Sequence, residues 1–458
     1  RLYFQAEGAV PVAITPSGFQ FADGTVDAAN RRMLWVREDH RPGTKAANGE
    51  ERNEIVALPL PPSSEDAGAV LVTGSDFVAY PRLSPDGKQL AWIEWNHPSM
   101  PWDRTRLKTA TLDDVRVHDV QTLIDDAKIA ALEPAFVGND LYAIADVGDW
   151  WNLHRWQGAQ RTAVSAMERE WAGPLWQLGA QSYGVNARGQ IVARSSKAAV
   201  DELGIVSADG TYRRLELPYQ SFGEVAWRGD DAIVAFANAA DDTGVLIEID
   251  AASGTHRVLH QPSALPVERT YLSVPKAIEF PSKAGNAHAW FYPPTHPTHQ
   301  GPNGAKPPLI VTIHGGPTSV SKATLNLSRQ YWTSRGFALV DVNYGGSTSF
   351  GRAYRERLNG QWGIVDVDDA IAAVDYLVAQ GLVDANKVAI RGGSAGGFTT
   401  LAALAFHDRF KAGTNLFGVS DIAGLAATSH KFERKYDVSL VGEPNEALYR
   451  ARSPIFHL

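Results

Sequence analysis

A short apolar run, Val388–Ile390, leads into a Gly-x-Ser-x-Gly pattern in which Gly392, Ser394 and Gly396 are fixed, and a helical stretch, Phe398–Ala405, follows. This order predicts a buried strand, a sharp turn with a serine at its apex, and a helix. We expect glycine at 392 and 396 because strand and helix nearly touch at such a turn, where the serine backbone is strained. The bend would lift the Ser394 hydroxyl out of a sheet.

A strand–turn–helix with serine at its apex is typical of the nucleophile elbow of α/β-hydrolases. The N–H of Ala395, at the start of the predicted helix, would point to where a negatively charged oxygen forms during attack on a carbonyl group. The five-residue pattern alone also fits a purely structural turn or a phosphate-binding turn. The flanking strand and helix favour the nucleophile.

Composition limits the remaining possibilities. A chain of 458 residues is too long for one ordinary core, so we expect two domains. A net charge of −8 without a Lys/Arg block argues against nucleic acid or an anionic membrane as partner, and no run of 18 apolar residues occurs. The absence of cysteine excludes disulfides, thiol catalysis and cysteine metal sites. We expect no metal and no cofactor.

Residues 1–266 contain many short strands and almost no helical periodicity, and we predict that they form the first domain. A turn rich in Asp, Asn or Gly repeatedly precedes an apolar strand, and the anchors of these strands are spaced 56, 51, 50 and 42 residues apart: Leu34, Leu90, Leu141, Ile191 and Ile233. This spacing predicts about five four-stranded blades of a β-propeller, whereas one or two β-sandwiches are the alternative. We expect the charged residues Glu38–His40 and Glu94 to be solvated loop ends.

Residues 267–458 form the second predicted domain, in which strands and helices alternate. The pattern predicts strands at 271–274, 288–292, 309–313, 337–342, 388–390 and 410–417, and helices at 325–333, 366–380 and 398–405. Such alternation indicates a doubly wound, mostly parallel sheet with its chemistry at the carboxyl ends of the strands.

The stretch His314-Gly315-Gly316-Pro317 follows the predicted strand 309–313. A Gly-Gly turn exposes backbone N–H groups, and the N–H of Gly316 together with that of Ala395 would complete an oxyanion hole. His314 and Gly315 would support this oxyanion loop. The alternative is an ordinary strand-to-helix turn.

A serine nucleophile needs a histidine base and an acid, which in this fold follow the serine in the order Asp or Glu, then His. Only 64 residues follow Ser394, and their histidines are His407, His430 and His457. None of these histidines follows a convincing further strand. We therefore expect the acid and the base beyond Leu458, and residues 1–458 alone to be inactive.

The chain resembles the prolyl oligopeptidase family of serine peptidases, in particular its acylaminoacyl-peptidase and dipeptidyl-aminopeptidase-like branch. The segments that carry the resemblance are His314-Gly315-Gly316-Pro317, Asn343-Tyr344-Gly345-Gly346-Ser347, Phe350-Gly351, Trp362-Gly363 and Gly392–Gly397. The resemblance implies a propeller of seven blades, of which about five are present, followed by an α/β-hydrolase domain that is incomplete at its C-terminus. The sequence would thus be a fragment truncated at both ends.

The resemblance also implies that the protein cleaves short peptides through an acyl-enzyme. The prolyl and dipeptidyl branches place a tyrosine hydroxyl in the oxyanion hole where this chain has His314. The Gly316 N–H is the expected donor instead, which argues against specificity for proline. Two other functions stay open: an esterase or lipase of the same fold, and a non-catalytic homologue. We expect a cytoplasmic location, although zero cysteines fit a bacterial periplasm equally well, and the sequence predicts no oligomeric state.

Overall fold

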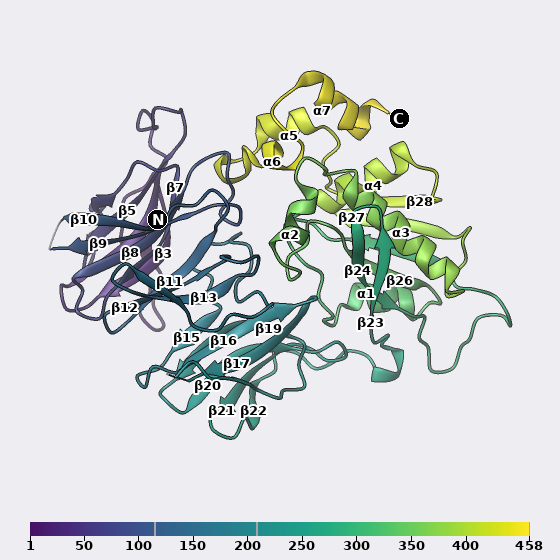
Figure 1. The fold of residues 1–458 in the computed structure, drawn as a ribbon, viewed down its shortest axis with the longest axis horizontal. Helices are drawn as coiled ribbons and strands as arrows, with labels where there is room; N and C mark the ends of the chain where they lie inside the picture. The colour runs from purple at the N-terminus through teal and green to yellow at the C-terminus, as the bar shows by residue number, and fades with distance from the viewer. Residues whose placement is uncertain (114–115, 208, 458) are drawn as a thin grey trace. The chain divides into compact units, whose positions relative to one another are not determined.

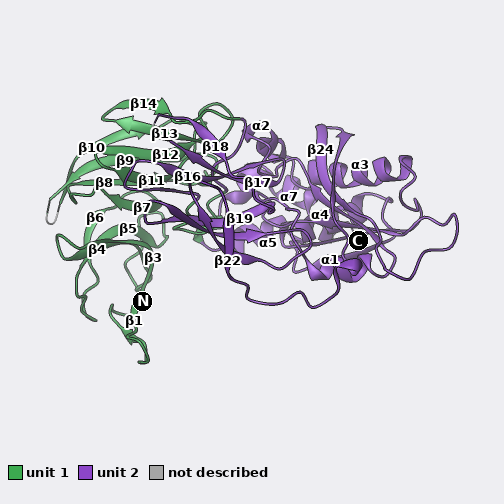
Figure 2. Ribbon diagram, turned by 90° about the horizontal axis from the view of Figure 1, so that it is seen from below, with its two compact units in different colours: residues 1–167, 174–181, 431–433 green, residues 168–173, 182–430, 434–458 purple. Residues whose placement is uncertain are grey.

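The computed structural model describes residues 1–113, 116–207 and 209–457 (Figure 1). Leu458, the last residue of the second predicted domain, lies outside the described residues. The chain packs into two compact units (Figure 2): unit 1 contains residues 1–167, 174–181 and 431–433, and unit 2 contains residues 168–173, 182–430 and 434–458. The predicted domain boundary at residues 266 and 267 stays a prediction.

Unit 1 contains a two-stranded sheet and three four-stranded antiparallel sheets. The small sheet pairs β1 (Tyr3–Phe4) with β2 (Val12–Ala13). The larger sheets have their strands in chain order: β3 (Phe19–Asp27), β4 (Arg32–Asp39), β5 (Arg52–Pro59) and β6 (Ala69–Val72); β7 (Phe77–Leu83), β8 (Gln89–Trp95), β9 (Arg106–Leu112) and β10 (Val117–Ile124); β11 (Ala131–Val137), β12 (Asp140–Ala145), β13 (Asn152–Gln157) and β14 (Gln160–Ala163).

Unit 2 begins with two more sheets of the same kind: β15 (Tyr183–Val185), β16 (Ile191–Lys197), β17 (Val200–Val206) and β18 (Tyr212–Arg214); β19 (Ser221–Arg228), β20 (Ala232–Asn238), β21 (Val245–Asp250) and β22 (His256–His260). Each of the five predicted anchors lies in the second strand of its own sheet, and each is buried. Five such sheets in the described residues, followed by a mixed sheet with helices, confirm the predicted fold class.

The blades are stabilised by apolar side chains that alternate along the strands. In unit 1, Leu34 and Ile55 of one sheet pack with Leu90 and Trp92 of the next, and all four side chains are at most 2% exposed. Full burial of such a side chain contributes about 1.5–3 kcal/mol. The repeat is therefore also a packing repeat at these two sheets, because they bury apolar faces against each other.

One expectation for the charged strand ends is wrong. Asp39 and Glu94 are buried rather than solvated. Asp39 accepts hydrogen bonds from the Arg41 guanidinium, which holds the pKa of that carboxyl down at about 2. Glu94 accepts a hydrogen bond from the Trp92 indole at 3.1 Å. Buried carboxylates stay charged only where such donors replace water, and the sequence pattern did not reveal these donors.

A three-residue segment, η3 (Lys431–Glu433), packs within unit 1 although the chain on both sides of it belongs to unit 2. Lys431 donates hydrogen bonds from Nζ to the carbonyl oxygens of Glu51 and Asp76, at 2.7 and 2.5 Å. The Phe432 ring lies 5.9 Å from the ring of Phe77, and it also contacts the indoles of Trp95, Trp102 and Trp176. The aromatic side chains of these blades therefore enclose a residue far away in the sequence.

The second half of unit 2 is built on a six-stranded sheet in the order β23-β24-β26-β25-β27-β28. Its strands are β23 (Lys276–Ser282), β24 (Gly285–Tyr292), β25 (Leu309–Ile313), β26 (Ala338–Asn343), β27 (Val388–Gly393) and β28 (Ala412–Leu416). Pairing is antiparallel from β23 to β26 and parallel from β26 to β28. The strand order reverses at β25, since β26 lies on one side of it and β27 on the other, and in such folds a crevice opens at the carboxyl ends of the strands at this point.

Helices cover this sheet. The helices and helical turns are η1 (Arg269–Tyr271), α1 (Leu327–Thr333), α2 (Arg352–Arg355), η2 (Glu356–Leu358), α3 (Val365–Ala379), α4 (Ala395–Phe406), α5 (Ile422–Thr428), α6 (Tyr436–Leu440), α7 (Glu446–Arg452) and η4 (Pro454–Phe456). Helix α3 packs on α4, β25 and β26, and α4 packs on β27 and β28 (Figure 1). No helix among the described residues meets the length and apolarity needed to cross a membrane.

The predicted elements of this half are confirmed within three residues at each end, except that the predicted strand at 271–274 is wrong. The segment has the alternating pattern of a strand, yet a side chain forms hydrogen bonds with the backbone groups of Ser273. Gln330 accepts a hydrogen bond from the Ser273 N–H at 2.7 Å, and its amide donates to the Ser273 carbonyl at 3.1 Å. Because both backbone groups are bonded to Gln330, Ser273 cannot join a ladder, and the first strand of the sheet begins at Lys276.

The first turn of α3 is fastened to α4 by a buried carboxylate. Asp366 is fully buried and accepts hydrogen bonds from the Gly363 N–H, at 2.6 Å, and from the Thr399 hydroxyl of α4. Beside it, the rings of Trp362 and Phe398 lie 4.1 Å apart. Burial raises the pKa of Asp366 from 3.8 to about 6, although the hydrogen bonds from Thr399 and Gly363 oppose this rise.

This shift predicts a pH-dependent stability. Because the pKa of Asp366 is higher in the folded state, its ionisation destabilises the fold progressively as the pH rises from about 4 to above 6. In the variant Asp366→Asn the side chain still pairs with Gly363 and Thr399 but carries no charge. Urea unfolding from pH 4 to 8 should show the variant gaining ~3 kcal/mol over the wild type across this range.

The matched control is Asp384→Asn, at a half-buried carboxyl whose pKa is lowered by a hydrogen bond from the Asn386 N–H. This control should show no gain in stability at neutral pH. An equal pH dependence in wild type and Asp366→Asn would contradict the assignment of the buried charge.

Candidate active site

Ser394 lies at the sharp bend between β27 and α4. Its backbone has φ 54° and ψ −121°, a region that costs a residue with a side chain about 1–3 kcal/mol. The Ser394 N–H donates to the Leu416 carbonyl of β28 at 3.0 Å, and the residue is exposed. The surrounding sheet and helix therefore hold this serine in a strained backbone conformation with its side chain accessible.

The two elbow glycines are required by contacts that leave no room for a side chain. A Cβ on Gly392 would lie 2.2 Å from the Gly396 carbonyl oxygen, where β27 meets α4. A Cβ on Gly396 would lie 2.3 Å from the carbonyl oxygen of Ile313 and 2.8 Å from that of His314. The start of α4 is thus pressed against the carboxyl end of β25.

This close approach brings the oxyanion loop to the serine. A Cβ placed on Gly315 would lie 3.5 Å from Ser394 Cβ and 3.2 Å from the Gly393 carbonyl oxygen. Gly316 has φ 123°, a conformation that favours glycine, and Ala395 is the first residue of α4. The structure therefore gathers Ser394, Ala395 and the Gly315–Gly316 turn at the ends of β27 and β25, and their catalytic roles stay predictions.

The His314 side chain is held by contacts with neighbouring protein groups on both of its ring nitrogens. Its Nδ1 lies 2.8 Å from the Gly315 carbonyl oxygen and its Nε2 lies 2.8 Å from Ser347 Oγ. The ring stacks on Tyr344 with centroids 4.4 Å apart. Burial lowers the pKa of His314, so the imidazole is neutral at neutral pH. The contacts require a proton on Nδ1, which donates to Gly315, while Nε2 accepts from Ser347.

The loop after β26, residues 344–351, was recognised in the sequence only as part of a family pattern. The structure shows that it lines the oxyanion loop, because Ser347 binds His314 and Tyr344 Oη donates to the Pro317 carbonyl at 3.3 Å. Asp369 of α3 accepts the Gly345 N–H at 2.7 Å. Sequence reasoning assigned no site role to Ser347, Tyr344 or Asp369. In the sequence, the glycines at 345 and 346 were the signal for such supporting residues, since they indicate a loop whose backbone conformation must be held by side chains from other elements.

Two of the three histidines that follow Ser394, and two of the acids, have contacts elsewhere. His407 caps the C-terminal end of α4, and the His457 ring packs on Phe406 at the same end, 4.8 Å between centroids. A helix of 12 residues places that end about 17 Å from Ser394. Asp421 caps α5, where it accepts the Ala423 N–H at 3.0 Å. Asp437 is buried and accepts the Tyr449 hydroxyl at 2.5 Å.

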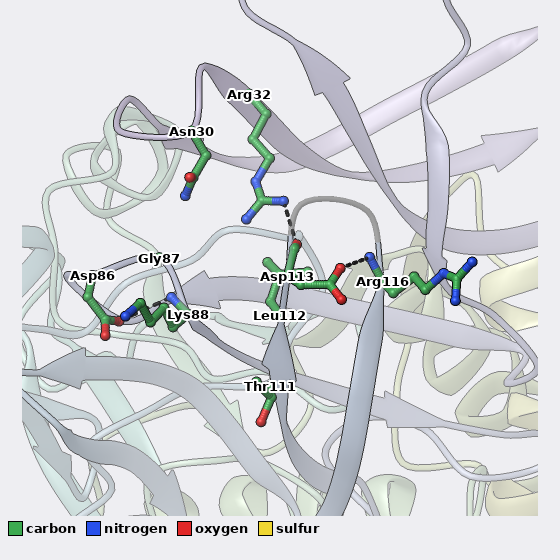
Figure 3. A pocket seen from close by; sticks show the side chains of 9 residues that line it. All are labelled: Asn30, Arg32, Asp86, Gly87, Lys88, Thr111, Leu112, Asp113 and Arg116. Atoms are coloured by element: carbon green, nitrogen blue, oxygen red, sulfur yellow. Dashed lines mark hydrogen bonds between the residues drawn. The ribbon is translucent and has the colours of Figure 1, made fainter.

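A cavity of about 690 Å³ lies in unit 1, and none of the residues above line it (Figure 3). It is lined by nine residues: Asn30, Arg32, Asp86, Gly87, Lys88, Thr111, Leu112, Asp113 and Arg116. Arg32 donates to the Asp113 carbonyl at 2.9 Å, and the Asp113 carboxylate accepts the Arg116 N–H at 2.8 Å. Its cations and acids are interspersed, so the lining does not select a ligand of either charge.

Comparison with known proteins identifies relatives of the chain. The model of the prolyl oligopeptidase family matches residues 323–458. A segment of 122 residues is 38% identical to dipeptidyl aminopeptidase BIII of Pseudoxanthomonas mexicana, and covers 26% of this chain and 18% of that protein. A segment of 93 residues is 44% identical to acylamino-acid-releasing enzyme 1 of Oryza sativa subsp. japonica, and covers 20% of this chain and 12% of that protein.

Among solved structures, a puromycin-hydrolyzing peptidase of Mycobacterium tuberculosis is 39% identical, with a TM-score of 0.94. The match covers 100% of this chain and 72% of that one. The matched segments span less than a fifth of the two curated relatives named above. The long structural match at this identity, the family model and the serine elbow agree. The chain belongs to the prolyl oligopeptidase family.

Proposed function

We propose that this protein is a serine peptidase that hydrolyses short peptides through an acyl-enzyme on Ser394. The observation that carries the proposal is the strained, exposed elbow beside the Gly315–Gly316 turn. The Ser394 hydroxyl attacks the scissile carbonyl. The N–H groups of Ala395 and Gly316 then stabilise the negatively charged oxygen, and a donor of this kind contributes roughly 3 kcal/mol to the transition state.

The neutral His314 orients the Gly316 donor rather than acting as the base. Both of its ring nitrogens face protein groups, Gly315 and Ser347, so neither is directed at Ser394. The base is a histidine from sequence beyond Leu458, oriented by an acid from the same part. Among the described residues, β28 is the last strand of the sheet, its residues are exposed throughout, and Phe417 beside it is 85% exposed.

The proposed substrates are peptides and aminoacyl amides with a free α-amino group. This choice follows the puromycin-hydrolyzing peptidase, because that likeness extends over the whole chain whereas the acylamino-acid-releasing and dipeptidyl enzymes match only short segments. The cytoplasmic location expected from the sequence remains a prediction, which cell fractionation would test.

The nucleophile is tested with a fluorophosphonate probe on the full-length protein. Because such probes react with an activated serine hydroxyl, the wild type should be labelled and Ser394→Ala should not. Ser253→Ala, which removes an exposed serine in a turn of the last blade, is the control and should be labelled like the wild type. Labelling that persists in Ser394→Ala would refute the proposal.

The origin of the base is tested by comparing residues 1–458 with the full-length protein. We expect the shorter chain to lose ~10⁴–10⁶ of the peptidase turnover, since triad members act as a unit. In the full-length protein, His407→Gln and His457→Gln should leave kcat unchanged. Ser394-dependent turnover by residues 1–458 would place the base within the described part of the chain.

The substrate class is tested with a panel of amides and esters on the full-length protein. Aminoacyl p-nitroanilides and puromycin should be cleaved with a kcat/KM at least tenfold above that for the N-acetylated aminoacyl p-nitroanilides. Peptide amides should turn over as well as p-nitrophenyl esters of the same acid when corrected for leaving-group reactivity. A preference for acetylated substrates would point to an acylaminoacyl peptidase, and hydrolysis of esters alone to an esterase.

A further inference from the structure

The segment Ser347–Ser349 behind the oxyanion loop is one of the most deeply buried parts of unit 2. Its three residues are at most 3% exposed. Ser349 has φ 79°, a strained conformation for a residue with a side chain, which persists only where neighbouring groups fix it. Among the described residues, the hydrogen-bond partners shown for Ser349 are residue 170 and the β16–β17 hairpin.

Glu170 is the first of these groups. It lies in the segment 168–173 before β15, and its side chain is 2% exposed. Its carboxylate accepts the N–H of Ser349 at 2.6 Å and that of Gly351 at 3.2 Å, and it lies 3.7 Å from the Arg355 guanidinium. A carboxylate buried this deeply is stable only with such donors, so it holds both N–H groups at fixed positions.

The hairpin between β16 and β17 binds the same serine from the other side. Ser349 Oγ lies 2.6 Å from Ser196 Oγ and accepts the Ala199 N–H at 2.9 Å. The Ala198 N–H donates to the Ser349 carbonyl at 2.8 Å. Glu170 belongs to the same arrangement, since its N–H and carbonyl exchange hydrogen bonds of 2.8 Å with Ser196.

Ser347, two residues before Ser349 in the chain, contacts the candidate site. Ser347 donates to His314 Nε2 at 2.8 Å, and His314 Nδ1 donates to the Gly315 carbonyl at 2.8 Å. Thr348, between the two serines, donates its N–H to the Ser319 carbonyl at 2.9 Å, on the chain that continues from Gly316. A short path therefore runs from Glu170 through Ser349 and Ser347, which are all buried, and through the half-buried His314 to the oxyanion loop.

We propose that Glu170 is a positioning residue for the reaction: it fixes Ser347 and His314, and through them the orientation of the Gly316 N–H. Glu170 does not touch the substrate. The proposal rests on the proposed function, because it needs Gly316 to act as an oxyanion donor. It predicts that loss of the carboxylate impairs the transition state more than substrate binding, since the oxyanion forms only after attack.

The test is Glu170→Gln in the full-length enzyme, which keeps the size of the side chain and removes its charge. An amide can accept one N–H but turns its NH₂ group toward the other donor, so one of the two bonds is lost. We expect kcat to fall about 10–100-fold with KM within twofold, because a displacement near 1 Å costs up to about 10²-fold. A kcat within threefold of the wild type would overturn the proposal.

Asp201→Asn is the matched control. Asp201 is also buried on the β16–β17 hairpin, and it accepts a hydrogen bond from Lys322 Nζ at 2.6 Å. Its partner Lys322 is not one of the residues that form the path through Ser347 and His314. We expect kcat of this variant within threefold of the wild type. An equal loss in Asp201→Asn and Glu170→Gln would mean that any weakened contact with the hairpin lowers activity, and would also overturn the proposal.

A double-mutant cycle with Ser347→Ala separates a shared path from two independent effects. Ser347→Ala alone should lower kcat to a similar degree, and the double variant should be no worse than about threefold below the poorer single variant. Multiplicative losses would show that Glu170 acts by another route. Should Glu170→Gln fail to fold, Ser196→Ala in the same network decides: an unchanged kcat overturns the proposal.

Fluorophosphonate labelling distinguishes this proposal from the proposed function. Absence of labelling and turnover in the wild type would refute the function itself. A wild type that is labelled and active, together with Glu170→Gln of unchanged kcat, would refute only the role of Glu170.

Discussion

The contact on which the candidate site depends is that between the first turn of α4 and the carboxyl end of β25. Gly396 meets the carbonyl oxygens of Ile313 and His314 so closely that a methyl group would overlap both. This contact places a helix N-terminus, a strained serine and the turn after β25 side by side. It also costs conformational entropy, because glycine loses more backbone freedom on folding than any other residue. The surrounding packing must therefore compensate for it.

Much of this arrangement could be predicted from local sequence, because its causes are local. A turn that needs glycine at 392 and 396 can be recognised in the sequence. Blade anchors such as Leu90 can also be recognised, because their spacing matches the number of residues in one four-stranded sheet. Predictions failed where a distant side chain decided the outcome. The segment at 271–274 has a strand pattern, but Gln330, 57 residues from Ser273 along the chain, occupies its backbone groups. The hydrophobic periodicity of a segment does not reveal a hydrogen-bond partner that is distant in the sequence.

The same limit applies to the candidate site. The oxyanion loop and the serine were visible in the sequence because each lies directly after an apolar strand. Their supports were not, since Glu170 is 179 residues from Ser349 and looks like any solvated acid in a loop. Burial converts such an acid from a surface residue into a fixed charge, and burial of a polar residue is a property of the fold rather than of its sequence neighbours.

Three buried carboxylates of unit 2 accept backbone N–H groups in the same way. Asp366 accepts the N–H of Gly363, Asp369 that of Gly345, and Glu170 those of Ser349 and Gly351. All of these donors lie in or beside glycine-rich loops that follow β26 or precede α3. Glycine lets the loops approach one another, but it leaves them many conformations. A carboxylate that accepts backbone N–H groups selects one of them without occupying the space that the glycine keeps free. The glycines and the buried carboxylates therefore have complementary roles: the glycines permit the close approach of the loops, and the carboxylates fix the loop conformation.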